Sequence, residues 1–194
     1  MATYKEKVGT SVVNYAGTYP GAVDGELWYD STNKNFNYQY NNVTTAGSWR
    51  TGNNLNTGRS GIAGAGTRDA ALGIGGDAPP NTADTELYNG TNWTEVNNLT
   101  TARAALAASG TSTAALAFGG SGPTAVTESW NGTNWTEVND LNTARVILAG
   151  DGTQTSSLAF GGSAPPNTTA TELWNGSNWT TVNSLNTARG ALAG

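Results

Sequence analysis

Nearly the same nineteen residues occur three times in this chain of 194 residues. The copies are TELYNGTNWTEVNNLTTAR at 85–103, TESWNGTNWTEVNDLNTAR at 127–145 and TELWNGSNWTTVNSLNTAR at 171–189. A tandem repeat builds its fold from one small unit, and each unit can bury its apolar face only against its neighbours. The repeat therefore restricts the fold more than any other feature of the sequence.

Landmark residues recur with the same spacing in each copy. The tryptophans Trp49, Trp93, Trp135 and Trp179 are 44, 42 and 44 residues apart, and four arginines share these spacings. The middle period is shorter because SGPTAVTES is two residues shorter than SAPPNTTATEL, which indicates a deletion in one loop. The other landmarks are Gly75, Gly76, Gly119, Gly120, Gly161, Gly162, Glu86, Glu128, Glu172, Arg59, Arg103, Arg145 and Arg189.

Each unit contains four short strand-like runs and shows no sustained helical period. In the second unit these runs are 103–109, 113–120, 125–130 and 134–139. A turn is predicted at Gly110-Thr111 between the first two runs, and Asn131-Gly132 predicts a type I′ hairpin turn between the last two. Four strands per unit, at a period of about 40–50 residues, predict an all-β fold made of β-propeller blades.

Side-chain size changes along each unit in the way that a blade requires. The first two runs are rich in Ala and Gly, which suits the crowded strands near a propeller axis. The large rings lie in the outer two runs: Tyr88, Trp93, Trp130, Trp135, Trp174 and Trp179. We expect Trp93, Trp135 and Trp179 to be largely buried between neighbouring blades, where they would fill the space left as the blades diverge.

This order of residues resembles the Kelch repeat. A double glycine is followed by Glu-x-aromatic, by Trp and by an Arg that opens the next unit: Gly119, Gly120, Glu128, Trp130, Trp135 and Arg145. The resemblance covers about residues 48–194 and implies a Kelch-type β-propeller. Its complete units would be 59–98, 103–140 and 145–184, with the start of another at 189.

Three complete units are too few for a closed ring, since propellers have about four to eight blades. Unpaired sheet edges would then remain at both ends. Either the natural chain continues beyond Gly194 or copies assemble to complete the ring. Continuation is favoured, because the sequence stops inside the strand-like run RGALAG.

Residues 1–47 lie outside the repeat and form a separate predicted domain. The segment GAVDGELWYDSTNKNFNYQYNN at 21–42 predicts a β-hairpin around a polar turn. It resembles the G-x-L-W-Y-D-x-T hairpins of fibre and appendage proteins of tailed bacteriophages, which implies a place in a virion. The preceding stretch looks extended, and we expect Tyr4, Tyr15 and Tyr19 to anchor it on another virion protein or a symmetry copy. The alternative is a plain hairpin that caps the first blade.

The composition removes several classes of function. The net charge is −5 and only 12% of residues are charged, so no basic surface is expected for nucleic acid or an anionic membrane. The chain has no His and no Cys, which excludes Ser-His and Cys-His pairs, His-ligated zinc, disulfides and the ligands of Kelch-fold copper oxidases. We expect no signal peptide and no membrane span, because no apolar run is long enough.

A carboxylate pair for glycoside hydrolysis is the one catalytic pattern that the acids could still form. The repeated glutamates occupy one position in every unit, so we expect structural pairing with repeated arginines such as Arg103 and Arg145. Asp69, Asp77 and Asp151 are isolated in predicted turns and form no calcium-loop pattern. We therefore predict no catalytic, cofactor-binding or metal-binding residues.

Recognition is expected in the loops, which differ in length and sequence while the blades stay constant. The candidate loops are 77–84, 121–124 and 163–170, and their candidate contact residues are Asp77, Pro79, Pro80, Pro123, Pro165 and Pro166. The Asn-x-Thr/Ser triplets coincide with predicted turns, so they indicate turn chemistry rather than glycosylation.

The leading hypothesis is a non-enzymatic virion protein of a tailed phage, a fibre- or decoration-like appendage of the tail or head. Its N-terminal part would attach it to the particle within a homo-oligomeric assembly, and its Kelch-like propeller would bind a host surface glycan or protein. The alternative is a cellular Kelch-repeat scaffold that binds a protein partner. A weaker alternative is a carbohydrate-active enzyme.

Overall fold

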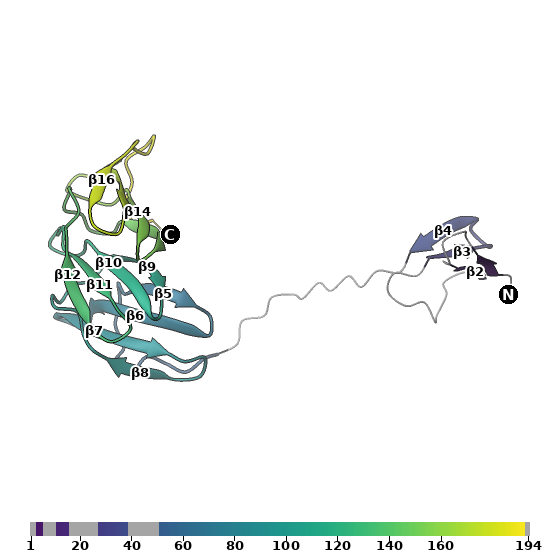
Figure 1. The fold of residues 1–194 in the computed structure, drawn as a ribbon, viewed down its shortest axis with the longest axis horizontal. Coiled ribbons are helices and arrows are strands. Elements are labelled where there is room, and N and C mark those ends of the chain that lie inside the picture. Colours follow the sequence, from purple (N-terminus) through teal and green to yellow (C-terminus); the bar gives the residue numbers. More distant parts are fainter. Residues whose placement is uncertain (1–2, 6–10, 16–26, 39–50, 193–194) are drawn as a thin grey trace. The chain divides into compact units, whose positions relative to one another are not determined.

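The computed structural model describes residues 3–5, 11–15, 27–38 and 51–192. These residues form sixteen β-strands and no helix, so the described part contains no helix that could cross a membrane. The prediction of an all-β fold is confirmed for these residues. The chain divides into two compact units, Met1–Arg50 and Thr51–Gly194, and Figure 1 labels most of their strands.

The first unit contains one four-stranded sheet in the order β1-β2-β3-β4. Its strands are β1 (Thr3–Lys5), β2 (Ser11–Tyr15), β3 (Leu27–Asp30) and β4 (Asn35–Tyr38). β3 and β4 form the predicted hairpin, and Asp30 holds its turn, because Oδ1 accepts the N–H groups of Thr32 and Asn33. β2 pairs with β3 in parallel, whereas the other two pairings are antiparallel.

The N-terminal stretch contributes strands to this sheet and is not a separate extended arm. Tyr4 in β1 lies opposite Val12, and Tyr15 in β2 lies opposite Asp30. Tyr19 falls outside the described residues. The expected extended conformation is confirmed for β1 and β2, but their backbones pair within the sheet of the hairpin and do not form an arm apart from it. Contact with another subunit stays a prediction.

The second unit consists of three four-stranded antiparallel sheets that follow one another along the chain, as predicted for residues 59–184. The first sheet contains β5 (Ala63–Thr67), β6 (Ala70–Asp77), β7 (Asn81–Tyr88) and β8 (Trp93–Val96). The second contains β9 (Ala107–Thr111), β10 (Ala114–Phe118), β11 (Thr127–Trp130) and β12 (Trp135–Val138). The third contains β13 (Ala149–Thr153), β14 (Ser156–Phe160), β15 (Thr171–Trp174) and β16 (Trp179–Thr181).

The first hairpin of the second sheet differs from the prediction. β9 begins at Ala107 and not at Arg103, because the residues before Ala107 connect the first sheet to the second. The chain turns at Ser112-Thr113 and not at Gly110-Thr111, because Gly110 still pairs with Ala115 in the ladder.

The loop between β11 and β12 is not the predicted type I′ turn. That turn needs positive φ at both central residues, whereas only Gly132 has one in this loop, at +92°. The Asn131 side chain supplies the missing turn, because its Oδ1 accepts the N–H groups of Thr133 and Asn134. The same Asn-capped loop joins β7 to β8 and β15 to β16.

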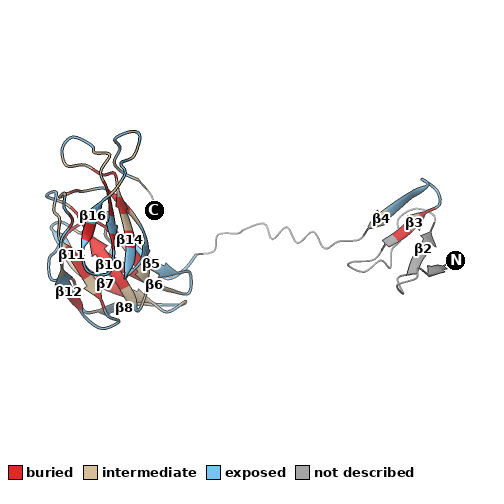
Figure 2. Cartoon of the chain, turned by 45° about the horizontal axis from the view of Figure 1, so that its top comes forward, coloured by how far each residue is buried: buried red, intermediate tan, exposed pale blue. Residues whose placement is uncertain are grey.

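The three sheets of the second unit pack face to face in series, with β5, β9 and β13 side by side (Figure 1). One apolar core lies between the first and second sheets, and another lies between the second and third. The strand β10, an inner strand of the second sheet, is therefore almost entirely buried (Figure 2). We call the face of a sheet that looks toward the preceding sheet its leading face, and the opposite face its trailing face. No sheet of the second unit precedes the first sheet, so its leading face is defined by repeat position. It is the face whose residues hold the same repeat positions as the leading-face residues of the second and third sheets.

Candidate functional site

Connectors join the sheets and contain the repeated arginines. Connector 97–106 lies between the first and second sheets, and connector 139–148 lies between the second and third. By the repeat spacing, residues 53–62 and 183–192 are the equivalent segments before the first sheet and after the third.

Arg103 links two sheets through both its backbone and its side chain. Its carbonyl accepts the N–H of Gly76 in the first sheet at 3.0 Å. Its buried guanidinium donates to Glu128 in the second sheet at 3.1 Å and to the carbonyl oxygens of Gly119 and Val126. A guanidinium has five donors in one plane, so one side chain can bind a carboxylate and two carbonyls at once. We call this arrangement the arginine clasp.

Arg145 makes the same clasp one unit later. Its carbonyl accepts the N–H of Gly120 at 2.8 Å, and its side chain donates to Glu172 at 2.8 Å. The carbonyl oxygens of Gly161 and Ala170 accept further bonds at 3.0 and 2.8 Å. Burial lowers the pKa of both clasp arginines, and the charge of the adjacent glutamate opposes this shift. The expected pairing of Arg103 and Arg145 with the repeated glutamates is confirmed, and backbone carbonyls are further partners of both guanidinium groups.

The outer arginines make only part of the clasp. Arg59 binds Glu86 in the first sheet, and its side chain is buried. Arg189 keeps the backbone contact, since its carbonyl accepts the N–H of Gly162 at 2.8 Å, but the residue is exposed. No further sheet follows among the described residues, so none of them offers this guanidinium an equivalent glutamate.

The first glycine of each pair is required by the clasp. Gly75, Gly119 and Gly161 have φ values of +60°, +69° and +61°, a conformation that residues with a Cβ rarely adopt. A Cβ at these positions would also lie 2.5, 2.8 and 2.7 Å from the carbonyl oxygen of the connector arginine. The glycine pairs therefore serve close backbone packing.

The repeated tryptophans reach from one sheet to the preceding one. The indole N–H of Trp135 donates to Thr85, and that of Trp179 donates to Thr127, both at 3.1 Å. These two rings are 6% and 5% exposed. Trp93 is only half-buried, so the expectation of burial is wrong for this ring. Among the described residues of the second unit, no sheet lies against the leading face that carries it.

A ladder of backbone bonds also runs through the connectors and escapes prediction from the sequence. Ala105 donates to the carbonyl of Gly61 at 2.7 Å, Ile147 to that of Ala105 at 2.9 Å, and Ala191 to that of Ile147 at 2.9 Å. All four residues have positive φ. The four residues share one repeat position, but their amino-acid types differ. The repeat spacing is therefore the one sequence signal that could have identified them.

The candidate recognition loops lie at the same end of the three sheets, since each joins the second strand to the third. Their prolines are all exposed: Pro79, Pro80, Pro123, Pro165 and Pro166. Asp77 differs from the prediction, because it ends β6 and pairs with Asn81, which shortens the first loop from 77–84 to 78–80. Asn81 Nδ2 donates to Ser121 Oγ at 2.7 Å and so joins this loop to the next.

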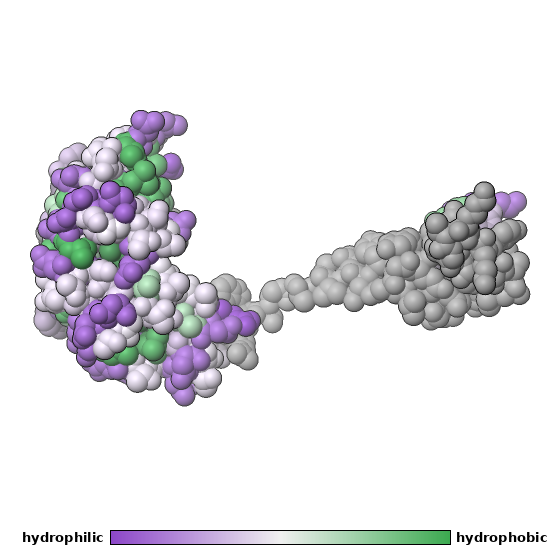
Figure 3. All heavy atoms as spheres, viewed as in Figure 1, coloured by the Kyte–Doolittle hydropathy of each residue, from purple (hydrophilic) through white to green (hydrophobic). Residues whose placement is uncertain are grey.

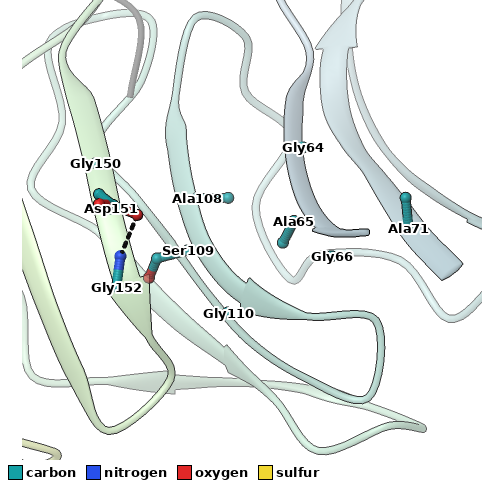
Figure 4. A pocket seen from close by; sticks show the side chains of 10 residues that line it. All are labelled: Gly64, Ala65, Gly66, Ala71, Ala108, Ser109, Gly110, Gly150, Asp151 and Gly152. Atoms are coloured by element: carbon teal, nitrogen blue, oxygen red, sulfur yellow. Dashed lines mark hydrogen bonds between the residues drawn. The ribbon is translucent and has the colours of Figure 1, made fainter. Parts of the chain in front are cut away.

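A hollow of about 360 Å³ lies against the innermost strands of the three sheets (Figure 4). Ala65, Ser109 and Asp151 occupy one repeat position on its wall, beside glycines and alanines. Asp151 is exposed, and its Oδ1 accepts the N–H of Gly152 at 2.8 Å. A lone carboxylate among such residues lacks the second acid that glycoside hydrolysis uses.

The repeated glutamates are also withdrawn from solvent. Glu86, Glu128 and Glu172 are buried, and each forms an ion pair with an arginine. Within the described part of the chain, no group of His, Cys, Asp and Glu side chains is arranged to hold a metal ion. The accessible surface drawn in Figure 3 is largely polar, with smaller hydrophobic areas. The exposed features of this unit are therefore its loops and its two outer sheet faces.

Comparison with known proteins bears on the fold alone. No protein-family model matches the sequence, and the curated proteins give no significant match. The solved structure of YjhT is similar, with a TM-score of 0.58 and 17% sequence identity over 81% of this chain and 51% of YjhT. The chain therefore spans about half the length of YjhT. At this identity, the similarity indicates a related arrangement of strands and transfers no function.

Proposed function

We propose that this chain is a non-enzymatic appendage protein of a tailed-phage particle. The first unit attaches it to the particle, and the second unit is a Kelch-like propeller segment that presents loops to a host surface. The observation that carries the proposal is the combination of a clasped repeat unit with a separate small sheet, whose hairpin resembles those of phage fibre proteins.

The packing of the second unit supports the propeller part of the proposal. In a propeller, blades of four strands surround a central axis, and their first strands lie nearest to it. Here β5, β9 and β13 lie side by side, while β8, β12 and β16 spread apart (Figure 1). The arginine clasp and the Trp–Thr bond recur at both internal contacts, so each sheet is placed on its neighbour in the same way.

The hairpin of the first unit supports the attachment part. The resemblance rests on the sequence LWYDST, of which Leu27–Asp30 form β3 and Asp30 shapes the turn. Trp28 is buried, whereas Phe36 on β4 is 64% exposed. Small sheets are marginally stable in water, and an exposed aromatic ring on one of them favours contact with another protein.

The loop prolines support the recognition part. They are exposed at one end of sheets that are fixed by buried clasps, and rigid scaffolds with variable exposed loops are the usual arrangement for binding. Neutral Thr, Asn and Ser side chains give these loops hydrogen-bonding groups with little charge, which suits a glycan or a protein surface.

Deletion of Met1–Arg50 tests the proposal. This deletion removes the whole first sheet, whereas removal of residues 2–20 alone would break it by taking β1 and β2. We expect the shortened protein to keep a β-type circular dichroism spectrum and to be absent from purified particles. A Pro123→Ser variant serves as the control and should be incorporated normally. Normal incorporation of the deletion variant would contradict the attachment role and favour a cellular scaffold.

A further inference from the structure

We infer that two copies of this chain close a ring together, with the trailing face of the third sheet docked on the leading face of the first sheet of the other copy. The inference goes beyond the proposed function. It rests on contacts that recur inside the second unit and does not require a place in a virion.

The third sheet leaves apolar residues uncovered on its trailing face. In the second sheet, Leu116 and Phe118 are 0% exposed, whereas their equivalents Leu158 and Phe160 are partly exposed. Leu173 lies opposite Leu158 on the same face and is 44% exposed. Figure 3 shows a hydrophobic area at the end of the unit that carries β14 and β16. Adjacent exposed apolar side chains of this kind mark a contact surface.

The leading face of the first sheet has an open position for such side chains. A Cβ at Gly64 would meet only the carbonyl oxygen of Leu72, at 3.8 Å, and Gly64 lines the hollow shown in Figure 4. Trp93 lies on the same face and is half-buried. Its indole N–H makes no hydrogen bond with the described residues, whereas those of Trp135 and Trp179 do.

The internal contacts show how side-chain sizes are matched between a trailing face and the leading face that follows. Phe118 packs directly on Gly150, where an added Cβ would lie 2.3 Å from the phenyl ring. At the other internal contact, the smaller Ile74 belongs to the core against which Ala108 packs. A phenylalanine therefore faces glycine at one contact, and at the other an isoleucine and an alanine share one core.

The two outer faces of the chain follow the same rule. Phe160 holds the position of Phe118, and Gly64 holds the position of Gly150. A second copy would thus place a glycine opposite Phe160. It would also bring Trp93 to Thr171, which holds the position of the threonines that accept the internal indole bonds. A second copy is the occupant that supplies both partners.

The number of sheets in the second unit agrees with a pair of copies. The matched part of one copy covers 51% of YjhT, so two such parts would correspond to about the whole of that protein. Each copy has three sheets in its second unit, and the resulting six fall within the range of about four to eight blades in closed propellers. A contact between a trailing face and a leading face is heterologous, because it joins two different surfaces. In a closed ring of two copies, this contact forms twice and covers both outer faces of each copy.

One connector must leave at each contact between copies. Inside the chain, a single connector lies at each contact between two sheets. At a contact between copies, residues 183–192 of one copy and residues 53–62 of the other would both occupy the position of that connector. Arg189 has an exposed side chain, whereas Arg59 is ion-paired with Glu86. The C-terminal segment is therefore the one that is released, and a chain without residues 183–194 should associate more tightly.

Sedimentation equilibrium of the full chain over a concentration series tests the inference. We expect a dimer that dissociates on dilution. Gly64→Leu fills the open position without strain in its own sheet and should weaken association by about tenfold or more, because overpacking disrupts a matched contact. Gly58→Leu is the control, since a Cβ at Gly58 meets nothing within 4 Å, and it should associate like the parent chain.

Chemical crosslinking supplies an independent readout, because the chain has no cysteine. Gly64→Cys combined with Phe160→Cys should give dimers with a short bis-maleimide reagent. Phe118→Cys combined with Gly150→Cys should instead be linked within one chain. Monomers at every concentration, or dimers that Gly64→Leu leaves unchanged, would overturn the inference. Open assemblies larger than a dimer would overturn the closed pair.

Discussion

The indole N–H of Trp135 donates to the hydroxyl of Thr85, a residue 50 positions earlier in the chain, at 3.1 Å. The bond joins the last strand of the second sheet to the third strand of the first, and both residues are buried. Trp179 and Thr127 repeat it between the next two sheets. The sheets are thus held together by side chains that the repeat spacing brings into contact.

Truncation of Trp135 should destabilise the second unit strongly. We expect Trp135→Ala to lower the free energy of unfolding by about 3–5 kcal/mol, because it empties a large volume in the core between two sheets. Trp93→Ala is the matched control and should cost less, since Trp93 is half-buried on an outer face. Urea denaturation measures both, and equal losses would contradict the difference in packing.

Loss of a clasp arginine should be costly as well. We expect Arg145→Ala to lower the free energy of unfolding by about 3–5 kcal/mol, because it leaves the buried carboxylate of Glu172 without its partner. Adding Glu172→Gln should restore part of that loss, since it removes the unpaired charge. Arg189→Ala, at the exposed equivalent, should change the value by only about 0.5 kcal/mol. A similar effect of the two alanine variants would argue against the clasp.

The repeat positions explain how much of the fold the sequence predicts. Three sheets of four strands, the Arg–Glu pairs and the burial of Trp135 follow from spacing, because each unit repeats the same contacts. Strand ends do not follow. Residues 103–106 have the composition of a strand, but the Arg103 N–H donates to the carbonyl of Thr82 in the first sheet. The Ala104 carbonyl accepts the N–H of Ser121, which follows β10 of the second sheet, so the backbone of this segment joins two sheets instead.

Identical positions also behave differently where their neighbours differ. Trp93 and Arg189 have the same local sequence signal as Trp135 and Arg145, yet they are more exposed because no other sheet of the second unit, in its described part, lies against them. The N-terminal stretch shows the reverse case. Its strands carry no repeat signal. β2 takes its place by pairing with β3, and β1 takes its place by pairing with β2, so neither place can be seen in the local sequence.

The stability of the second unit should depend little on pH around neutrality. The chain has no His and no Cys, and arginine ordinarily loses its proton only in strongly alkaline solution. Burial lowers the pKa of Arg103 and Arg145, so the unfolded chain binds more protons only in strongly alkaline solution, where their contribution to stability rises with pH. We expect a constant melting temperature between about pH 6 and 9, measured by circular dichroism. A steep change there would point to a titrating group outside the clasps.

Exchange of one loop should separate recognition from folding. Replacing residues 163–170 by SGPTAV, the shorter sequence at the equivalent place in the second unit, keeps a loop that the repeat already accepts. We expect a melting temperature close to that of the parent chain and weaker attachment of particles to host cells. Attachment at the parental level would show that this loop does not contact the host.

The position of the protein on particles tests the proposed function most directly. Particles produced from the genome that carries the gene would be purified, labelled with a gold-conjugated antibody against residues 51–194 and viewed by electron microscopy. We predict label at a regular position on the tail or head, and its loss when Met1–Arg50 is deleted. Unlabelled particles from cells that contain the intact protein would contradict a virion role.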